Sequence, residues 1–570
     1  MNSPLSLTIL VPLVGAMAVA MVAPAGRGAV RLIALGSSLL TLALAAVVVV
    51  QFPAQTGHYE ADWFGLADAG IDVRLAVGLD GLSVWLFGLS ALLTLTAVLI
   101  SWEAVSDRAA SYYALLLVLE TGMLGVFAAQ DIILFYIFFE FTLIPLFFLI
   151  GVWGSDDRRR AAMKFFLFTF AGSVLTFLGL LLIVFWNYTH DADRVLTFSI
   201  PALTDGLAAT PITPLALQVA VFLLLFAGFA IKVPLFPLHT WLPLAHVEAP
   251  AAGSVLLAGV LLKVGTYGFV RFNYSMLPAA TAICAPVLLW LSVAGIVYGA
   301  LVALAQSDIK RLIAYSSVSH LGFCMLGIFA ANRLGLQGGV LQMISHGLST
   351  GGLFALVGML YERYHTRNIA DLGGLARRLP LLATFMLVMT FSSIGLPGLN
   401  GFVGEFLLLL GMFQQAFGGQ LEPALALQLQ VISVLAVSGV VLGAWYMLWL
   451  VQRVFFGPLR EPATHHGNGA AHGSGVDHAQ HVRDLSAREV AALLPLTVFI
   501  VWIGVAPNVF VQRMSPALDP LADGVEQALR QRDGDSATEL AETTSLEPST
   551  AGTATAPSIS QLLKDHGRAR

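Results

Sequence analysis

Six ionisable side chains stand inside long apolar stretches of the sequence, in the order carboxylate, lysine, lysine, histidine, histidine, carboxylate. They are Glu140, Lys232, Lys263, His320, His346 and Glu405. A charged group at the centre of a membrane helix costs about 2.5–3.5 kcal/mol on insertion scales, and it usually persists because it pairs or lines an ion path. Proton-accepting groups on successive helices are what lateral proton transfer between two half-channels needs. The series therefore predicts proton or cation movement.

The depth of these groups follows from helix geometry. Glu140 comes nine residues after Asp131, which at about 1.5 Å per residue places it ~14 Å along a helix, near the bilayer centre. Lys263 lies about eleven residues into its stretch, too deep for easy snorkelling. His320 and His346 stand on consecutive stretches, and histidine suits a proton relay near neutral pH. A structural carboxylate, a snorkelling lysine and a packed histidine remain open alternatives.

Other ionisable groups give weaker signals. Glu120 is mid-membrane by the same arithmetic and is singled out on physical grounds alone. Five histidines fall within 465–481, but this loop has no cysteine and no helical spacing, so we expect no functional metal there. Haem ligation by His320 and His346 stays open, although the sequence offers no second axial pair.

The amino-acid composition indicates that lipid, and not water, surrounds most of the chain. Of 570 residues, 57% are hydrophobic and 11% are charged, against roughly 25% charged in a soluble domain. Such a chain has too few charges to cover a water-exposed surface. Two cysteines exclude a disulfide framework, a four-cysteine zinc site and an iron–sulfur cluster held by this chain alone. The net charge of -5 gives no footprint for nucleic acid, and the sequence contains no Rossmann fingerprint and no P-loop.

Apolar stretches long enough to span a membrane, roughly 20 residues each, recur along the chain. We place fourteen of them, near 5–23, 30–51, 79–101, 112–129, 131–150, 161–187, 214–236, 252–271, 282–305, 312–330, 338–360, 381–415, 427–455 and 488–510. The seventh and the twelfth carry helix breakers, which are Pro234 and Pro237 in one and Gly395, Pro397, Gly398 and Gly401 in the other. Broken helices in corresponding parts of two halves are typical of inverted-repeat transporters. We therefore predict an all-α polytopic fold with repeats at 112–272 and 282–455.

The rest of the chain divides around these repeats. Residues 1–111 hold the N-terminal membrane helices, 461–486 form a His-rich cytoplasmic loop, 488–510 form the last span, and 515–570 read as a mobile C-terminal tail. With the N-terminus outside and the tail left out, inner loops carry seventeen Lys and Arg residues and outer loops carry four. The positive-inside rule then predicts that both termini lie outside.

Four stretches resemble the M subunit of bacterial respiratory complex I, the counterpart of mitochondrial NADH dehydrogenase subunit 4. They are FYIFFEFTLIPLFFLIGVWG (135–154), KVPLFPLHTWLPLAHVEAPAAGSVLLAGVLLKVGTYGFVRF (232–272), SDIKRLIAYSSVSHLGF (307–323) and GLPGLNGFVGEF (395–406). The second stretch favours the M subunit over the related L and N subunits. The resemblance covers roughly residues 80–455.

The resemblance implies an antiporter-like fold within NADH:quinone oxidoreductase of the bacterial inner membrane, so the outer side that the Lys and Arg bias predicts for both termini is the periplasm. It implies Glu140 and Lys232 as an ion pair, Lys263 as the central relay, His320 and His346 as further relay, and Glu405 as the exit group, where some relatives carry lysine. Membrane lipid, L- and N-type subunits and peripheral-arm subunits would be the partners. FMN, iron–sulfur clusters and quinone would bind to partner subunits and none to this chain. An Mrp-type cation/proton antiporter subunit, an energy-converting hydrogenase subunit and a structural scaffold of the membrane arm remain alternatives.

Overall fold

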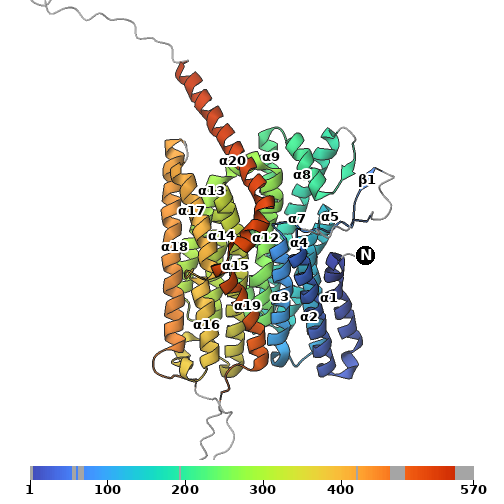
Figure 1. Cartoon of the computed structure of the whole chain (residues 1–570), viewed down its shortest axis with the longest axis vertical. Coiled ribbons are helices and arrows are strands. Elements are labelled where there is room, and N and C mark those ends of the chain that lie inside the picture. The colour runs from blue at the N-terminus through green and yellow to red at the C-terminus, as the bar shows by residue number, and fades with distance from the viewer. Residues whose placement is uncertain are drawn as a thin grey trace, which may run out of the picture.

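The helices of this chain form a membrane bundle. The computed structural model describes residues 4–53, 60–61, 70–191, 194–418, 422–462 and 482–545, with side chains described as far as 532. Within these residues, fourteen helices are long and apolar enough to cross a membrane. Figure 1 shows most of them side by side, with one C-terminal helix running obliquely across the bundle. The predicted all-α polytopic fold with fourteen spans is confirmed.

The first part of the chain contains ten α-helices and a short strand pair. The helices are α1 (Pro4–Met21), α2 (Arg27–Gln51), α3 (Val84–Ala104), α4 (Ala109–Ala128), α5 (Ile132–Phe141), α6 (Leu143–Trp153), α7 (Arg158–His190), α8 (Ile200–Ala209), α9 (Leu215–Lys232) and α10 (Trp241–Glu248). Strands β1 (Ile71–Asp72) and β2 (Leu196–Thr197) pair in parallel. Helices α5 and α6 together make one span, interrupted at Thr142.

The second part begins with a span of mixed helical type. This span consists of α11 (Ala251–Leu256), the π-helical turn η3 (Leu257–Leu261), α12 (Leu262–Gly268) and the π-helical turn η4 (Phe269–Tyr274). The helices that follow it are α13 (Pro278–Leu304), α14 (Ile309–Phe329), α15 (Arg333–Tyr364), α16 (Pro380–Ser393), α17 (Asn400–Gly418), α18 (Pro423–Phe455), α19 (Ala487–Val505) and α20 (Asn508–Ser545). The sequence patterns did not predict the two π-helical turns. Such turns are rare and are frequent at functional sites.

The first predicted break separates α9 from α10. Helix α9 ends at Lys232 because Pro234 and Pro237 have no N–H to continue it. Side chains and local turns satisfy the interrupted backbone: the Trp241 indole donates to the carbonyl of Ile231 at 2.9 Å. A buried break is tolerated in a membrane when its backbone groups find partners within the protein.

The second predicted break separates α16 from α17. Gly395 and Gly398 adopt φ values of +72° and +91°, which glycine reaches without strain. Asn400, the first residue of α17, accepts a hydrogen bond from the Ser392 hydroxyl at 2.5 Å and donates one to the carbonyl of Ser345 at 3.2 Å. The side chain of Asn400 thus ties together the two half-helices and α15.

The predicted mobile tail at 515–570 is wrong for its first part. Residues 508–545 are helical, and Met514, Leu518 and Leu529 of this helix are buried. Apolar residues spaced three to four apart form one face that packs on α13 and α15. The polar composition of the segment hid this narrow apolar stripe. Residues 546–570 and the histidines at 465–481 lie outside the described residues.

Candidate functional site

Lys263 stands at the centre of the predicted site. It is completely buried, and its Nζ lies 2.6 Å from Nδ1 of His346. The ammonium nitrogen also donates to the carbonyl of Ala258 in η3. The π-helical turn η3, just before Lys263, thus positions the carbonyl of Ala258 to accept a hydrogen bond from the lysine side chain.

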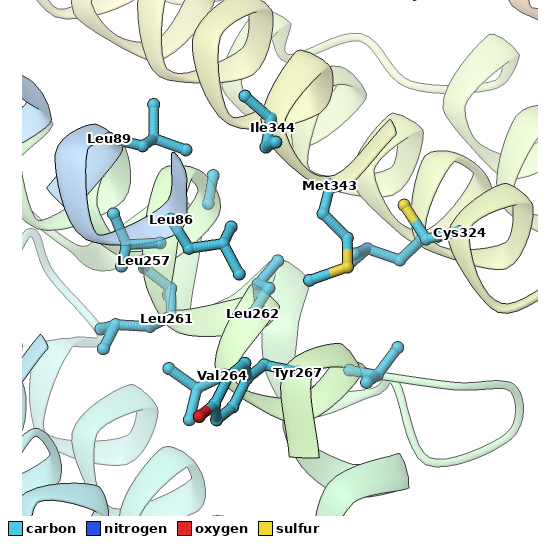
Figure 2. Close-up of a cluster of buried hydrophobic side chains, with 14 of the residues drawn as sticks. Leu86, Leu89, Leu257, Leu261, Leu262, Val264, Tyr267, Cys324, Met343 and Ile344 are labelled. Carbon is cyan, nitrogen blue, oxygen red and sulfur yellow. The ribbon is translucent and has the colours of Figure 1, made fainter. Parts of the chain in front are cut away.

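A close approach of two helices brings Lys263 and His346 together. A Cβ added at Gly347 would lie 2.7 Å from the carbonyl oxygen of Gly259, so only glycine permits this spacing of η3 and α15. Around the contact the side chains are apolar; Figure 2 shows Leu86 of α3, Leu262 of α12 and Met343 of α15 in this layer. An apolar surround keeps water away and strengthens electrostatic interactions inside it.

The contacts continue from His346 to Glu405. The rings of His346 and His320 have centroids 5.5 Å apart. Nδ1 of His320 lies 3.5 Å from a carboxylate oxygen of Glu405, and Nε2 of His320 lies 3.1 Å from the Ser393 hydroxyl. Four of the six predicted residues therefore form one series, from α12 through α15 and α14 to α17.

Two polar residues of this network were missed by the sequence analysis. Gln342 donates to the Glu405 carboxylate at 3.1 Å, and Ser393 contacts His320 as the last residue before the second break. Gln342 precedes His346 by four residues and so shares its helix face. That spacing was the available signal, but an uncharged residue does not stand out in a search for charges.

The predicted ion pair between Glu140 and Lys232 is not a direct contact in this structure, although the two charges interact electrostatically. Among the described residues, no ion pair within 4.0 Å joins them. Lys232 is buried, and its Nζ lies 4.2 Å from the centroid of the Phe139 ring, a cation–π contact. Glu140 is half-buried, and its Oε1 has no hydrogen-bond partner among the described residues. The residue order Phe139–Glu140 placed the correct segment beside Lys232, but the aromatic ring takes the close position.

Further buried polar groups surround the series. His246 of α10 interacts electrostatically with Lys263 and Lys310, and its ring stacks on Phe354 with centroids 4.5 Å apart. Lys310, the second residue of α14, is buried and donates to the carbonyl of Ala249. Glu120 is fully buried, and neither carboxylate oxygen has a partner within the described part of the chain.

No metal site emerges from the residues that the structure describes, since no group of three or more His, Cys, Asp or Glu side chains there could hold an ion. The series instead consists of groups that accept and release protons: Lys263 contacts His346 directly, the His346 and His320 rings lie side by side, and His320 lies 3.5 Å from Glu405. Such an arrangement can pass a proton sideways through the bundle from α12 to α17.

The fold and the buried series define an antiporter-like membrane protein. Residues 129–419 match the family described as NADH:quinone oxidoreductase/Mrp antiporter, transmembrane. NADH-quinone oxidoreductase subunit M of Rhodobacter capsulatus is 39% identical over 526 residues, covering 91% of this chain and 96% of the relative. NADH-ubiquinone oxidoreductase chain 4 of Chondrus crispus is 37% identical over 513 residues, covering 90% and 96%.

Solved structures show the same fold. One chain of respiratory complex I from Thermus thermophilus with bound NADH aligns with a TM-score of 0.76 and 33% identity, covering 92% of this chain and 99% of that chain. A chain of the Mrp complex from Dietzia sp. aligns with a TM-score of 0.72 at 22% identity, covering 93% and 100%, which shows a shared fold alone. This chain belongs to the family of NADH-quinone oxidoreductase subunit M and NADH-ubiquinone oxidoreductase chain 4, as the sequence motifs predicted.

Proposed function

We propose that this chain is a proton-translocating subunit in the membrane arm of NADH:quinone oxidoreductase, and that its protons pass through the buried series from Lys263 to Glu405. The observation that carries the proposal is the contact of Lys263 with His346 at 2.6 Å, continued through His320 to Glu405. A purely structural role does not require four adjoining protonatable groups in an apolar interior, because each one costs insertion free energy.

Proton uptake is assigned to the side of the bundle where α14 begins. A cleft of about 520 Å³ opens there, lined in part by Lys310 and Glu362. His246 interacts electrostatically with Lys310 at this cleft and with Lys263 at the centre. These interactions support His246 as the link between the cleft and the start of the series. The inner, cytoplasmic assignment of this side rests on the Lys and Arg bias of the sequence, with both termini periplasmic in the bacterial inner membrane.

Coupling is assigned to the first break. A change of charge near Glu140 or Lys232 alters the electrostatic potential at Lys263, because α9 packs against α12 in an apolar interior. A positive charge arriving near Lys232 would drive the proton of Lys263 toward His346. In this scheme FMN, iron–sulfur clusters and quinone belong to partner subunits, and redox energy reaches this chain through neighbouring L- and N-type subunits.

The test is Lys263→Ala in the intact complex reconstituted into vesicles. We expect proton pumping by this subunit to stop and coupled quinone reduction to fall strongly, while the complex stays assembled. Arg160→Ala, at an exposed position on α7, is the control and should leave both unchanged. An unchanged proton-to-electron ratio in Lys263→Ala would overturn the proposal.

Assembly has its own test. Mass spectrometry of the complex purified through this chain should find peripheral flavin and iron–sulfur subunits together with L- and N-type subunits. Recovery with Mrp-type partners and no flavin subunit would contradict the assignment to NADH:quinone oxidoreductase.

A further inference from the structure

An apolar cavity opens among five helices of the bundle. It has a volume of about 90 Å³ and is surrounded by side chains of α2, α3, α15, α19 and the first turn of α20. Leu89 of α3 and Ile344 of α15, both labelled in Figure 2, line its wall. Of the described side chains that line it, only the Trp85 indole carries a polar group, and its N–H donates to the carbonyl of Phe510 at 3.3 Å. A cavity of this kind takes up an apolar group and not water.

The cavity runs parallel to the helices that surround it. Its lining extends over residues 42–49 of α2 and 85–92 of α3, which is about 10 Å along each helix. The same helix α2 exposes Val47 and Val50, and α19 exposes Val505. Exposed apolar side chains beside a membrane cavity face lipid. The length and direction of the cavity therefore match a stretch of an acyl chain that enters from the bilayer.

One arginine stands where the cavity meets the end of the bundle. Arg513 of α20 lies over the Trp85 ring, with its Cζ 5.3 Å from the ring centroid, and its Nη1 donates to the carbonyl of Val49 at 3.0 Å. Among the described residues, no carboxylate forms an ion pair with Arg513 within 4.0 Å. Trp85 therefore contacts both the apolar cavity and an arginine that has no acidic partner within this part of the chain.

A cleft of about 480 Å³ adjoins this arginine. It is lined by Gln512 and Arg513 of α20 and by Phe52 at the end of α2, so it lies at the level where the spans end. Asp80 also lines the cleft, but its carboxylate lies 2.6 Å from Nη2 of Arg271 and is paired there. The charge of Arg513 therefore remains to be neutralised, and an anionic headgroup at this depth of a bilayer is complementary to it.

We propose that this site binds an anionic phospholipid, with an acyl chain in the apolar cavity and the phosphate against Arg513 in the cleft. One molecule fits both parts because Trp85 lines the cavity, Arg513 lines the cleft, and the two side chains are in contact. The bound lipid joins the first turn of α20 to α2 and α3. Lipid binding at this site does not depend on the proposed proton path. A free phosphate would use the cleft alone, and an apolar side chain of a neighbouring subunit would use the cavity alone.

The experiment uses phosphatidylglycerol with a photoreactive diazirine in its acyl chain, and the intact complex reconstituted into phosphatidylcholine vesicles. After illumination, mass spectrometry should find the label on residues 42–49 of α2 and 85–92 of α3. Phosphatidylcholine with the same diazirine should label these segments about fivefold less, the factor that one arginine adds to the attraction of anionic lipid at a membrane surface. Added inorganic phosphate should leave the labelling unchanged, because it cannot fill the cavity.

Two variants test the two parts of the site separately. Arg513→Gln should remove the preference for phosphatidylglycerol, whereas Arg530→Gln, at an exposed and paired position on the same helix, should keep it. Ala46→Phe fills the cavity from an exposed position on α2 and should remove most of the label from α3. Ala43→Phe is its matched control, since Ala43 is exposed on the same helix but does not line the cavity.

The outcomes distinguish the possible occupants. Equal labelling by the two lipids, or a preference that survives Arg513→Gln, overturns the anionic site, as does competition by inorganic phosphate. Labelling that is absent from α2 and α3 but present on other lipid-facing helices overturns the lipid site and leaves a neighbouring subunit's side chain as the occupant. Should Arg513→Gln fail to assemble, Ala46→Phe against Ala43→Phe still decides whether the chain lies in the cavity, and equal label in these two variants refutes it.

Discussion

The two broken helices serve their charged groups in different ways. At the second break, Glu405 lies within reach of His320 and Gln342, and Asn400 joins the half-helices to α15. At the first break, Lys232 faces the Phe139 ring and interacts with Glu140 electrostatically, without a direct ion pair. The second break therefore adjoins the series of contacts that ends at Glu405. The first break holds the charge of Lys232, which a change of charge nearby can influence. In the proposed scheme, transfer therefore runs from Lys263 toward the second break, and the first break serves coupling.

The strongest test of this comparison removes one residue from the series between Lys263 and Glu405. His320→Ala removes the link between His346 and Glu405, and we expect coupled turnover to fall about a hundredfold, the lower end for loss of a proton-transfer group. Proton flux and quinone reduction in reconstituted complex give the measurement. His190→Ala, at the exposed end of α7, is the control. Full pumping in His320→Ala would mean that the series is not the path.

The first break predicts a smaller response. Phe139→Leu keeps the volume apolar but removes the cation–π contact of Lys232, worth roughly 1 kcal/mol, so a coupled rate that depends on this charge should change about fivefold. Uncoupled turnover with an ionophore should stay unchanged. A loss as complete as that of His320→Ala would erase the distinction between the two breaks.

The two breaks should also differ in the free energy of local opening. Asn400→Ala removes the hydrogen bonds of its side chain with the Ser345 carbonyl and the Ser392 hydroxyl and leaves that buried hydroxyl without its acceptor, at a cost of about 2–3 kcal/mol in the local opening free energy. Trp241→Phe removes one hydrogen bond, to the carbonyl of Ile231, and should cost about 1 kcal/mol. Hydrogen exchange of the detergent-solubilised complex measures both. Equal protection losses at the two breaks would show that the Asn400 network adds nothing.

The sequence predicted this architecture because apolar length and helix breakers are local signals. Fourteen spans, both breaks and the depth of Lys263 follow from such signals. The Lys232–Phe139 contact could not be predicted, because it depends on which side chain of α5 faces α9. The π-helical turn before Lys263 contains a single glycine, Gly259, which does not by itself predict a π-turn, and its geometry comes from packing on α15 at Gly347.

For helix α20, the composition predicted a disordered segment where the structure has a docked helix. Its composition is that of a solvated segment, yet its apolar stripe finds a surface on α13 and α15 that exists only in the folded bundle. Arg333 strengthens the docking through a paired contact with Asp523. Composition therefore predicts disorder best for segments that have no folded surface beside them.

This ion pair gives the smallest effect and a defined pH dependence. Hydrogen bonds from Arg333 lower the pKa of the exposed Asp523 carboxyl. The pair therefore stabilises docking above the ordinary carboxyl pKa, and the contribution is lost as the pH falls through the lowered value. Asp523→Asn should slightly raise hydrogen exchange in α20 relative to wild type at pH 7, because exposed pairs are weak and screened by salt. The difference should vanish in acid, where the wild-type carboxyl is also neutral.

Glu526→Gln provides the control for this last effect. Glu526 pairs with Arg530 on the same helix and is only a minor charge for Arg333, so its loss changes mainly the helix and leaves the Arg333–Asp523 hydrogen bonds in place. If both variants altered exchange equally, the Arg333 contact would be incidental, and the apolar stripe alone would hold α20 on the bundle.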